Sequence, residues 1–176
     1  MKVSLKTIKI LTAALLLTAL LFGSFGCVRH THIVMESRRI GDFFCSVYED
    51  GTVDITAWSG TDEELRIPSK LDGLSVVGFG MKTFDSFEHL KAVYIPGTVT
   101  SLPAKLFNAC PNLEKIYIPA SVKSIGQNVI FNCPNLNTVL YGGTQAQWDE
   151  IYVGAVPWTD NYDLINSEIV YEYKMQ

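Results

Sequence analysis

Hydrophobic positions recur along the middle of this chain with a period of 23 residues. The segment LKAVYIPGTVTSLP at 90–103 is followed by LEKIYIPASVKSIG at 113–126, and a weaker copy, LNTVLYGGTQAQW, occupies 136–148. An earlier copy starts at Leu65, where the sequence LRIP stands 28 residues before its counterpart. A fixed period of this length is typical of a solenoid, in which one short unit stacks on itself. The pattern predicts about four strand rungs.

Each unit carries apolar residues at fixed positions, and we expect these residues to share one core. The strand positions are Val93, Ile116 and Val139, followed by Ile95, Ile118 and Tyr141. Two further sets with the same spacing lie between the strands: Phe84, Phe107 and Ile130, and Phe79, Leu102 and Ile125. Because side chains alternate between the two faces of a strand, the residues between the strand anchors are expected to face outward. We name this outward set the sheet-face row; it consists of Arg66, Tyr94, Tyr117 and Leu140, with Lys115 beside it.

The sheet-face row is a candidate binding surface. Aromatic and arginine side chains supply much of the binding energy at protein interfaces. Tyrosine is also a good strand former, and cross-strand tyrosine pairs stabilise any sheet, so a purely structural role stays equally open. Four rungs project to about 250 Å², whereas a standard interface buries roughly 800 Å² per partner. The row alone is therefore expected to bind weakly unless many copies act together.

Atypical segments are expected at both ends of the repeats at 65–141, because the end turns of a solenoid would otherwise expose its core. Residues 42–64 begin with alternating apolar and polar residues around Asp50–Gly51, and they predict an N-terminal β-hairpin cap. A second turn is expected at Asp72–Gly73, where the first copy carries five extra residues.

Residues 142–176 predict a C-terminal cap made of a helix and a strand. Thr144 and Gln147 have the spacing of a capping box, which places a short helix after residue 144. Asp149 and Glu150 are expected in the first turn of that helix, where acidic groups favour the helix dipole. The alternating tail at 167–173 predicts a last strand with one apolar face, made of Ile169, Tyr171 and Tyr173.

The N-terminus indicates export from the cytoplasm. Three lysines precede an apolar run at 10–22, and small residues follow it, so residues 1–26 are predicted to be a signal peptide. A run of 13 residues spans about 20 Å as a helix, which is short of a roughly 30 Å hydrocarbon core. Gly26–Cys27 is similar to the end of a bacterial lipobox, which implies lipidation of Cys27; cleavage without lipidation and an uncleaved anchor are the alternatives. Residues 27–41 are then expected to tether the domain.

Charge and cysteine spacing narrow the classes of partner. Without residues 1–26 the chain keeps eleven basic and eighteen acidic residues, a formal net charge of −7, which disfavours nucleic acid. Cys45, Cys110 and Cys133 lack a Cys-x-x-Cys spacing and are expected to fill the core, with a Cys110–Cys133 disulfide as the alternative. We expect no metal site and no cofactor.

The pattern L-x-x-V-x-I-P, together with IPSKLDGLSVVGFG and GGTQAQWDEI, resembles the BspA-like (Treponema-type) leucine-rich repeats of bacterial surface proteins. The resemblance covers roughly 42–173. It implies a leucine-rich-repeat solenoid, a short right-handed β-rich superhelix, with the two caps described above. Thr98, Ser121 and Thr144 stand where other leucine-rich repeats carry Asn or Cys, so the buried asparagine ladder of those relatives is expected to be absent.

The function expected from this resemblance is that of an extracytoplasmic, lipid-anchored module for protein or glycan binding. Its ligand would be a host or bacterial surface component, and the N-terminal lipid would hold it on the membrane. It would then be located in the cell envelope, or secreted into the medium if the lipobox is not used. A structural or accessory subunit of an envelope complex is the alternative. A polysaccharide-acting enzyme is a remote one, since no catalytic motif occurs and only Trp58, Trp148 and Trp158 suggest sugar platforms.

Overall fold

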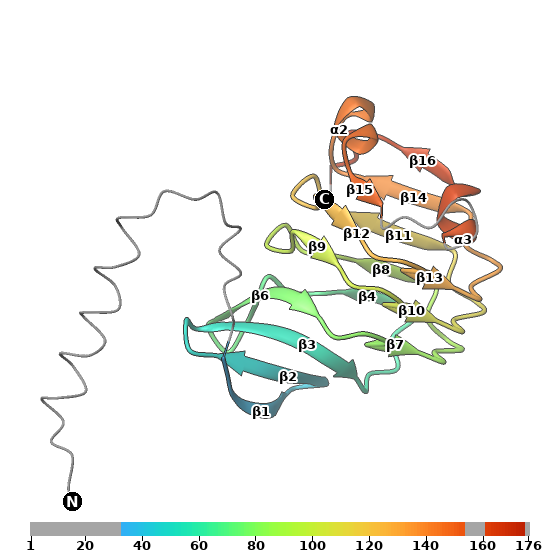
Figure 1. Cartoon of the computed structure of the whole chain (residues 1–176). Coiled ribbons are helices and arrows are strands. Elements are labelled where there is room, and N and C mark those ends of the chain that lie inside the picture. Colours follow the sequence, from blue (N-terminus) through green and yellow to red (C-terminus); the bar gives the residue numbers. More distant parts are fainter. Residues whose placement is uncertain (1–32, 154–160, 175–176) are drawn as a thin grey trace, which may run out of the picture. The chain divides into compact units, whose positions relative to one another are not determined.

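The computed structural model describes residues 33–153 and 161–174. The predicted signal peptide at 1–26, Cys27 and Trp158 lie outside the described residues. The repeats form a solenoid in which three parallel sheets run alongside one another (Figure 1). The fold class expected from the sequence is confirmed, and the additional sheets show that the anchors between the main strands are themselves in short strands.

The main sheet has five parallel strands, which come from successive turns of the solenoid. They are β4 (Glu64–Arg66), β8 (Ala92–Tyr94), β11 (Lys115–Ile118), β14 (Thr138–Tyr141) and β16 (Glu168–Val170). The 23-residue period sets the register, since Ile116 is aligned with Val93 on one side and with Val139 on the other. The last strand is the one predicted from the C-terminal tail.

Two three-stranded parallel sheets complete each turn. The first contains β9 (Ser101–Leu102), β12 (Ser124–Ile125) and β15 (Tyr152–Val153). The second contains β7 (Phe84–Asp85), β10 (Phe107–Asn108) and β13 (Ile130–Phe131). We call these the β9 sheet and the β10 sheet. Their strands are two residues long, which is too short for a period of two to be recognised in the sequence.

The apolar anchors of all three sheets meet in one core. Phe84 and Phe107 are fully buried, and their rings stack with centroids 5.0 Å apart. Cys110 and Cys133 are also fully buried and are free thiols, which agrees with their expected role as core residues. Each turn therefore contributes side chains to a column that continues into the next turn.

The corners of the β10 sheet require left-handed backbone at residues other than glycine. Every turn has one such residue before the strand and one after it: Lys82, Lys105 and Asn128, then Ser86, Ala109 and Asn132. Hydrogen bonds between turns hold these corners, as where the Ala109 N–H donates to the Phe131 carbonyl over 3.0 Å. Regular stacking therefore fixes a backbone conformation that these residues do not favour on their own.

A five-stranded sheet covers the N-terminal end of the solenoid. Its order is β1 (Val34–Ile40), β2 (Phe43–Tyr48), β3 (Thr52–Trp58), β6 (Leu74–Phe79) and β5 (Lys70–Leu71). The predicted hairpin is present as β2 and β3, with Gly51 at a φ of 78° in its turn. The second predicted turn is also present, since Asp72 and Gly73 both have positive φ and join β5 to β6.

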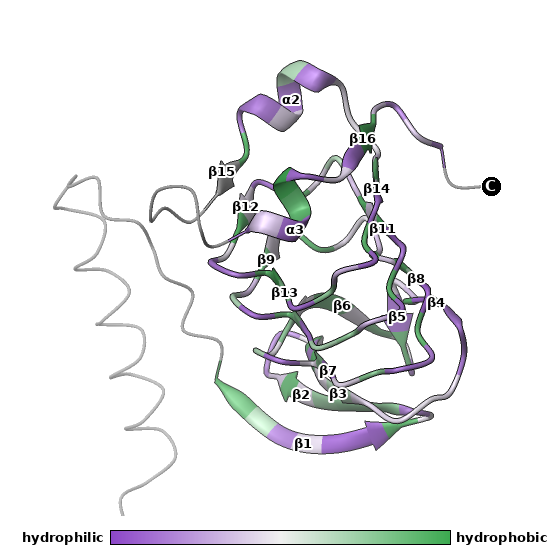
Figure 2. Ribbon diagram, turned by 90° about the vertical axis from the view of Figure 1, so that its right-hand side faces the viewer, coloured by the Kyte–Doolittle hydropathy of each residue, from purple (hydrophilic) through white to green (hydrophobic). Residues whose placement is uncertain are grey.

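β1 lies within the range 27–41 that the sequence predicts to be a tether, so seven residues of that range belong to a strand. Most of its side chains are exposed; two apolar residues come first, four polar residues follow, and the apolar Ile40 ends the strand (Figure 2). An edge strand held by main-chain pairing needs no alternating pattern, which is why the sequence did not reveal it.

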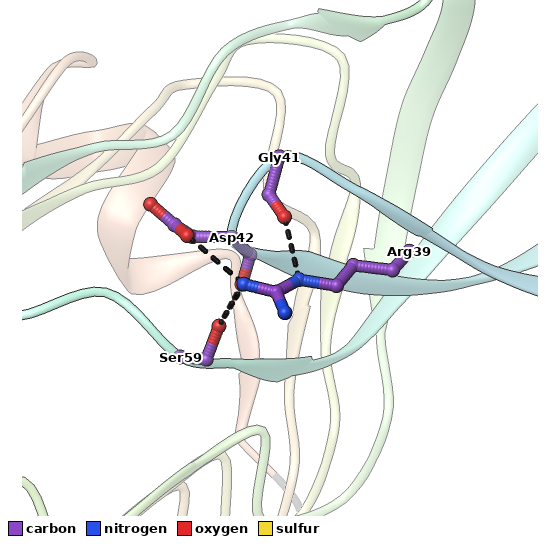
Figure 3. Close-up of polar contacts among 4 residues, drawn as sticks. All are labelled: Arg39, Gly41, Asp42 and Ser59. Atoms are coloured by element: carbon purple, nitrogen blue, oxygen red, sulfur yellow. Dashed lines mark hydrogen bonds and ion pairs between the residues drawn. The ribbon is translucent and has the colours of Figure 1, made fainter.

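Hydrogen bonds of the Arg39 side chain link the end of β1 to the residue that follows β3. Its Nε donates to the Gly41 carbonyl over 2.8 Å, and one terminal nitrogen contacts Asp42 at 3.3 Å and Ser59 at 3.2 Å (Figure 3). Arg38 lies 3.6 Å from the Asp72 carboxylate. Both arginines thus contact acidic residues of their own chain.

The C-terminal cap contains α2 (Gln145–Asp149) and α3 (Tyr162–Ile165). The predicted capping box is present, since the Gln147 N–H donates to the Thr144 hydroxyl and the Gln147 side chain accepts from the Thr144 N–H. The expectation for Asp149 and Glu150 is wrong, because Asp149 ends α2 and Glu150 is its C-cap. The helix is only five residues long, so its first turn already ends before them.

The tail beyond β16 stays hydrogen-bonded to the end of β14 and places Tyr173 on the outer face of the main sheet. Glu172 has a φ of 55°, which ends the extended conformation. Ile169 and Tyr171 therefore pack on the core, whereas Tyr173 packs on the opposite, outer face of the main sheet. The expectation that all three side chains share one face is wrong for Tyr173.

Candidate binding site on the main sheet

The sheet-face row forms a continuous stack on the outer side of the main sheet. Strand pairing aligns Arg66 with Tyr94, Tyr94 with Tyr117, and Tyr117 with Leu140. The Arg66 guanidinium lies 4.0 Å from the centre of the Tyr94 ring, within the range of a cation–π contact. The rings of Tyr94 and Tyr117 stack with centroids 6.4 Å apart and an angle of 28° between their planes.

The row is more enclosed than its outward direction suggests. The exposed fractions are 7% for Tyr94, 9% for Tyr117 and 6% for Leu140. The Tyr173 ring packs against Tyr117 at 5.8 Å, so the C-terminal tail covers part of the surface. These residues form a small second apolar cluster outside the main core, which supports a structural contribution of the two tyrosines.

Charged groups surround this cluster and remain accessible. Glu64 accepts a hydrogen bond from Arg66 over 2.8 Å, and about half of each side chain is exposed. Burial raises the pKa of Tyr94 and of Tyr117 above that of a free phenol, about 10, which is itself protonated at neutral pH, so both hydroxyls can donate a hydrogen bond there. Lys115, which is half-buried, pairs with Ala92 and Thr138 on the neighbouring strands. The surface therefore offers phenol donors, one guanidinium and one ammonium around an apolar centre.

The tryptophans do not form sugar platforms where the structure describes them. Trp58 is only 5% exposed, and its ring lies 5.0 Å from that of Phe87. Trp148 is partly buried and meets the Tyr141 ring edge to face at 5.0 Å. Both side chains therefore pack within the ends of the solenoid, Trp58 at the N-terminal cap and Trp148 at the C-terminal cap, and neither forms an open aromatic surface.

No group of three or more metal-ligating side chains occurs within 33–153 and 161–174. The same residues contain no helix that is long and apolar enough to cross a membrane.

An asparagine ladder runs along the outside of the solenoid, at a position that the sequence analysis did not single out. Asn112 donates to the Glu88 carbonyl over 2.5 Å, and Asn135, one period later, donates to the Pro111 carbonyl over 2.8 Å. The phrase CPNL, which occurs at 110–113 and again at 133–136, contains both asparagines and could have indicated this ladder. At the position where other repeats carry Asn, Ser121 instead donates to the Val99 carbonyl over 2.6 Å.

A groove beside the N-terminal cap was also missed. It measures about 420 Å³ and lies between the hairpin and the β9 sheet. The Tyr48 hydroxyl donates to Asp54 over 2.7 Å on its wall. Burial, followed by this hydrogen bond, raises the pKa of Tyr48 to about 12. The groove joins residues that are far apart in the sequence, so no local pattern predicts it.

Stacked parallel strands with a 23-residue register and a capped core define the chain as a leucine-rich-repeat solenoid. The family model for the BspA type leucine rich repeat region matches residues 63–150 with six copies. The chain belongs to this family.

Two solved structures are similar to the chain. A leucine rich repeat protein of T. pallidum has a TM-score of 0.54 and 23% identity, over 60% of this chain and 53% of that one. A leucine rich cell surface protein of Faecalibacterium prausnitzii A2-165 has a TM-score of 0.42 and 20% identity, over 69% of this chain and 44% of that one. The chain thus spans about half the length of each. No curated protein matches it.

Proposed function

We propose that this protein is an extracytoplasmic binding module of the adhesion type, which uses the outer face of its main sheet. The observation that carries the proposal is the sheet-face row, where Arg66 and Lys115 border a rigid aromatic surface. A rigid surface loses little conformational entropy on binding, which favours recognition even over a small area. Leucine-rich-repeat proteins of this family are typically non-enzymatic binding modules, and the proposal agrees with that role.

Anchoring through a lipid on Cys27 is the second part of the proposal. The support is the signal-like sequence at 1–26 and the short distance along the chain from Cys27 to β1. Exposed apolar residues, Ile33, Val34 and Met35, follow within eight residues of Cys27. Many copies held on one membrane would compensate by avidity for the small area of each binding surface.

One experiment tests both parts. The full chain is expressed in bacteria, palmitate incorporation is measured, and the purified protein is applied to an array of extracellular-matrix proteins and glycans. We expect Arg66→Ala/Lys115→Ala to weaken binding to the captured ligand about tenfold or more, while the control Phe44→Ala on the N-terminal cap leaves it unchanged. The sheet-face proposal is wrong if the double variant binds every captured ligand like the unmodified protein. Palmitate incorporation that persists in Cys27→Ala would contradict the anchor.

A further inference from the structure

Two aromatic side chains near the C-terminal end of the solenoid, one on β13 and one on α3, are more than half exposed. Phe131 is 51% exposed, and the corresponding residues of the two preceding turns are polar, Asp85 and Asn108. Those two bond to each other, with the Asn108 amide donating to Asp85 over 2.6 Å. Tyr162 on α3 is 67% exposed. Phe131 and Tyr162 line one hollow together, so they form an exposed aromatic patch, and such patches mark candidate ligand sites.

Both residues line one cavity. It measures about 200 Å³ and is lined by Asn128, Ile130, Phe131, Asn132, Pro134, Tyr162 and Asp163. Its polar wall is held in place, because Asp163 accepts the Cys133 N–H over 3.0 Å through one carboxylate oxygen. Asn128 and Asn132 occupy the left-handed corners that flank β13, so their backbone is fixed by the repeat.

The cavity continues along the solenoid. A second hollow of about 260 Å³ shares Asn132 and Pro134 with the first and extends to Ser86, Glu88, Ala109 and Pro111 on the preceding turns. Each hollow is smaller than the roughly 300 Å³ at which pockets for drug-sized ligands begin. Two adjoining hollows of this size fit two linked small rings better than one large ligand.

The lining chemistry favours a sugar. Aromatic faces attract the C–H groups of a pyranose ring, amide groups donate to and accept from its hydroxyls, and carboxylates accept from them. The charged residues that line the two hollows are Glu88 and Asp163, both acidic, so an anionic glycan would be repelled. We infer that this groove, which we name the corner groove, binds two consecutive units of a neutral oligosaccharide. The inference rests on the proposed role as a binding module but uses a different face of the molecule.

The test uses the full chain, purified in a detergent without a sugar headgroup, and titrations followed by saturation-transfer NMR. The probes are chitotriose, mannotriose and cellotriose, with sialyllactose as the anionic comparison. At least one neutral trisaccharide should bind, and Phe131→Ala and Tyr162→Ala should each weaken that binding about fivefold to tenfold. Both side chains are exposed, so the melting temperature should stay close to that of the unmodified protein.

Two control variants separate this inference from the proposed function. Phe44→Ala removes another exposed aromatic ring, on the N-terminal cap, and should leave sugar binding unchanged. Arg66→Ala/Lys115→Ala should also leave it unchanged, whatever that variant does to matrix-protein binding. The inference is overturned if none of the neutral sugars binds, if the Phe131→Ala/Tyr162→Ala double variant binds like the unmodified protein, or if sialyllactose binds equally well.

Discussion

Individual residues at the corners of the solenoid carry a conformational cost that the repeat imposes on them. Ala109 has a φ of 52°, a conformation that costs an L-residue roughly 1–2 kcal/mol. The next turn holds Ala109 in this conformation, because the Ala109 N–H donates to the Phe131 carbonyl. Asn132, at the same corner of the next turn, is a residue type that tolerates this conformation better.

Replacement of Ala109 by glycine should therefore stabilise the protein. Removal of the Cβ relieves the left-handed strain, and the greater freedom of glycine in the unfolded chain, roughly 0.5–1 kcal/mol, offsets part of the gain. We expect Ala109→Gly to raise the free energy of unfolding by up to about 1 kcal/mol, measured by urea denaturation. The matched control is Ala92→Gly in β8, which lacks positive φ and should lose stability. Equal losses in both variants would contradict this account.

At the scale of elements, the sequence was most informative where a pattern is repeated or local. The register of the main sheet follows from the 23-residue period, and the turns at Asp50–Gly51 and Asp72–Gly73 follow from dipeptides that favour positive φ. β1 could not be predicted, because its pairing with β2 depends on main-chain hydrogen bonds rather than on side-chain alternation. Tyr173 was assigned to the wrong face, since a single left-handed residue, Glu172, lies within an otherwise alternating tail.

The candidate sites were predictable to a smaller extent. Alternation on the main strands predicted that the sheet-face row lies on the outer surface, but it could not show that the Tyr173 ring packs against Tyr117. The corner groove was not predicted at all. It depends on the contact between α3 and β13, which brings Tyr162 and Phe131 to the same hollow. α3 lies outside the repeats, so their period could not predict this contact.

The C-terminal cap stabilises the last turn by imitating the missing next one. Along the β10 sheet the N–H groups of one turn donate to carbonyls of the following turn, as Phe107 does to Val129 over 2.9 Å. After the final turn, the Asn161 side chain takes over this role, since its oxygen accepts the Val129 N–H over 2.9 Å and its nitrogen donates to the Gly126 carbonyl over 3.3 Å. Asn161 is only 3% exposed.

Loss of the Asn161 amide should destabilise the whole cap. Asn161→Ala leaves a buried N–H without its partner, and an unsatisfied buried group costs about 1–3 kcal/mol. We expect a decrease of that size in the free energy of unfolding by urea denaturation. Asn166→Ala is the matched control, because Asn166 donates to the Tyr162 carbonyl in an exposed position and should cost less than about 1 kcal/mol. If the two variants lose the same stability, Asn161 does not act as a substitute for a further turn.

Across the whole molecule, buried and half-buried tyrosines couple folding to alkaline pH. Burial is the main cause that raises the pKa of Tyr48, Tyr94, Tyr117 and Tyr141. These residues occupy the N-terminal cap, the main sheet and the boundary with the C-terminal cap, so the effect is spread along the solenoid. Each phenol keeps its proton in the folded protein at a pH where the unfolded chain, with a pKa near 10, has begun to lose it.

The sign of the pH dependence follows from this difference. The stabilisation is fully present below a pH of about 10 and is lost as the pH rises through the folded values, which for Tyr48 is about 12. We expect the urea midpoint to fall between about pH 10 and 12, together with the phenolate absorbance that marks ionisation. Tyr48→Phe should make this fall shallower, and Asp54→Asn should do so in part, because the Asp54 carboxylate contributes to the raised pKa of Tyr48. A urea midpoint that stays constant over this range would show that the folded and unfolded chains release these protons alike.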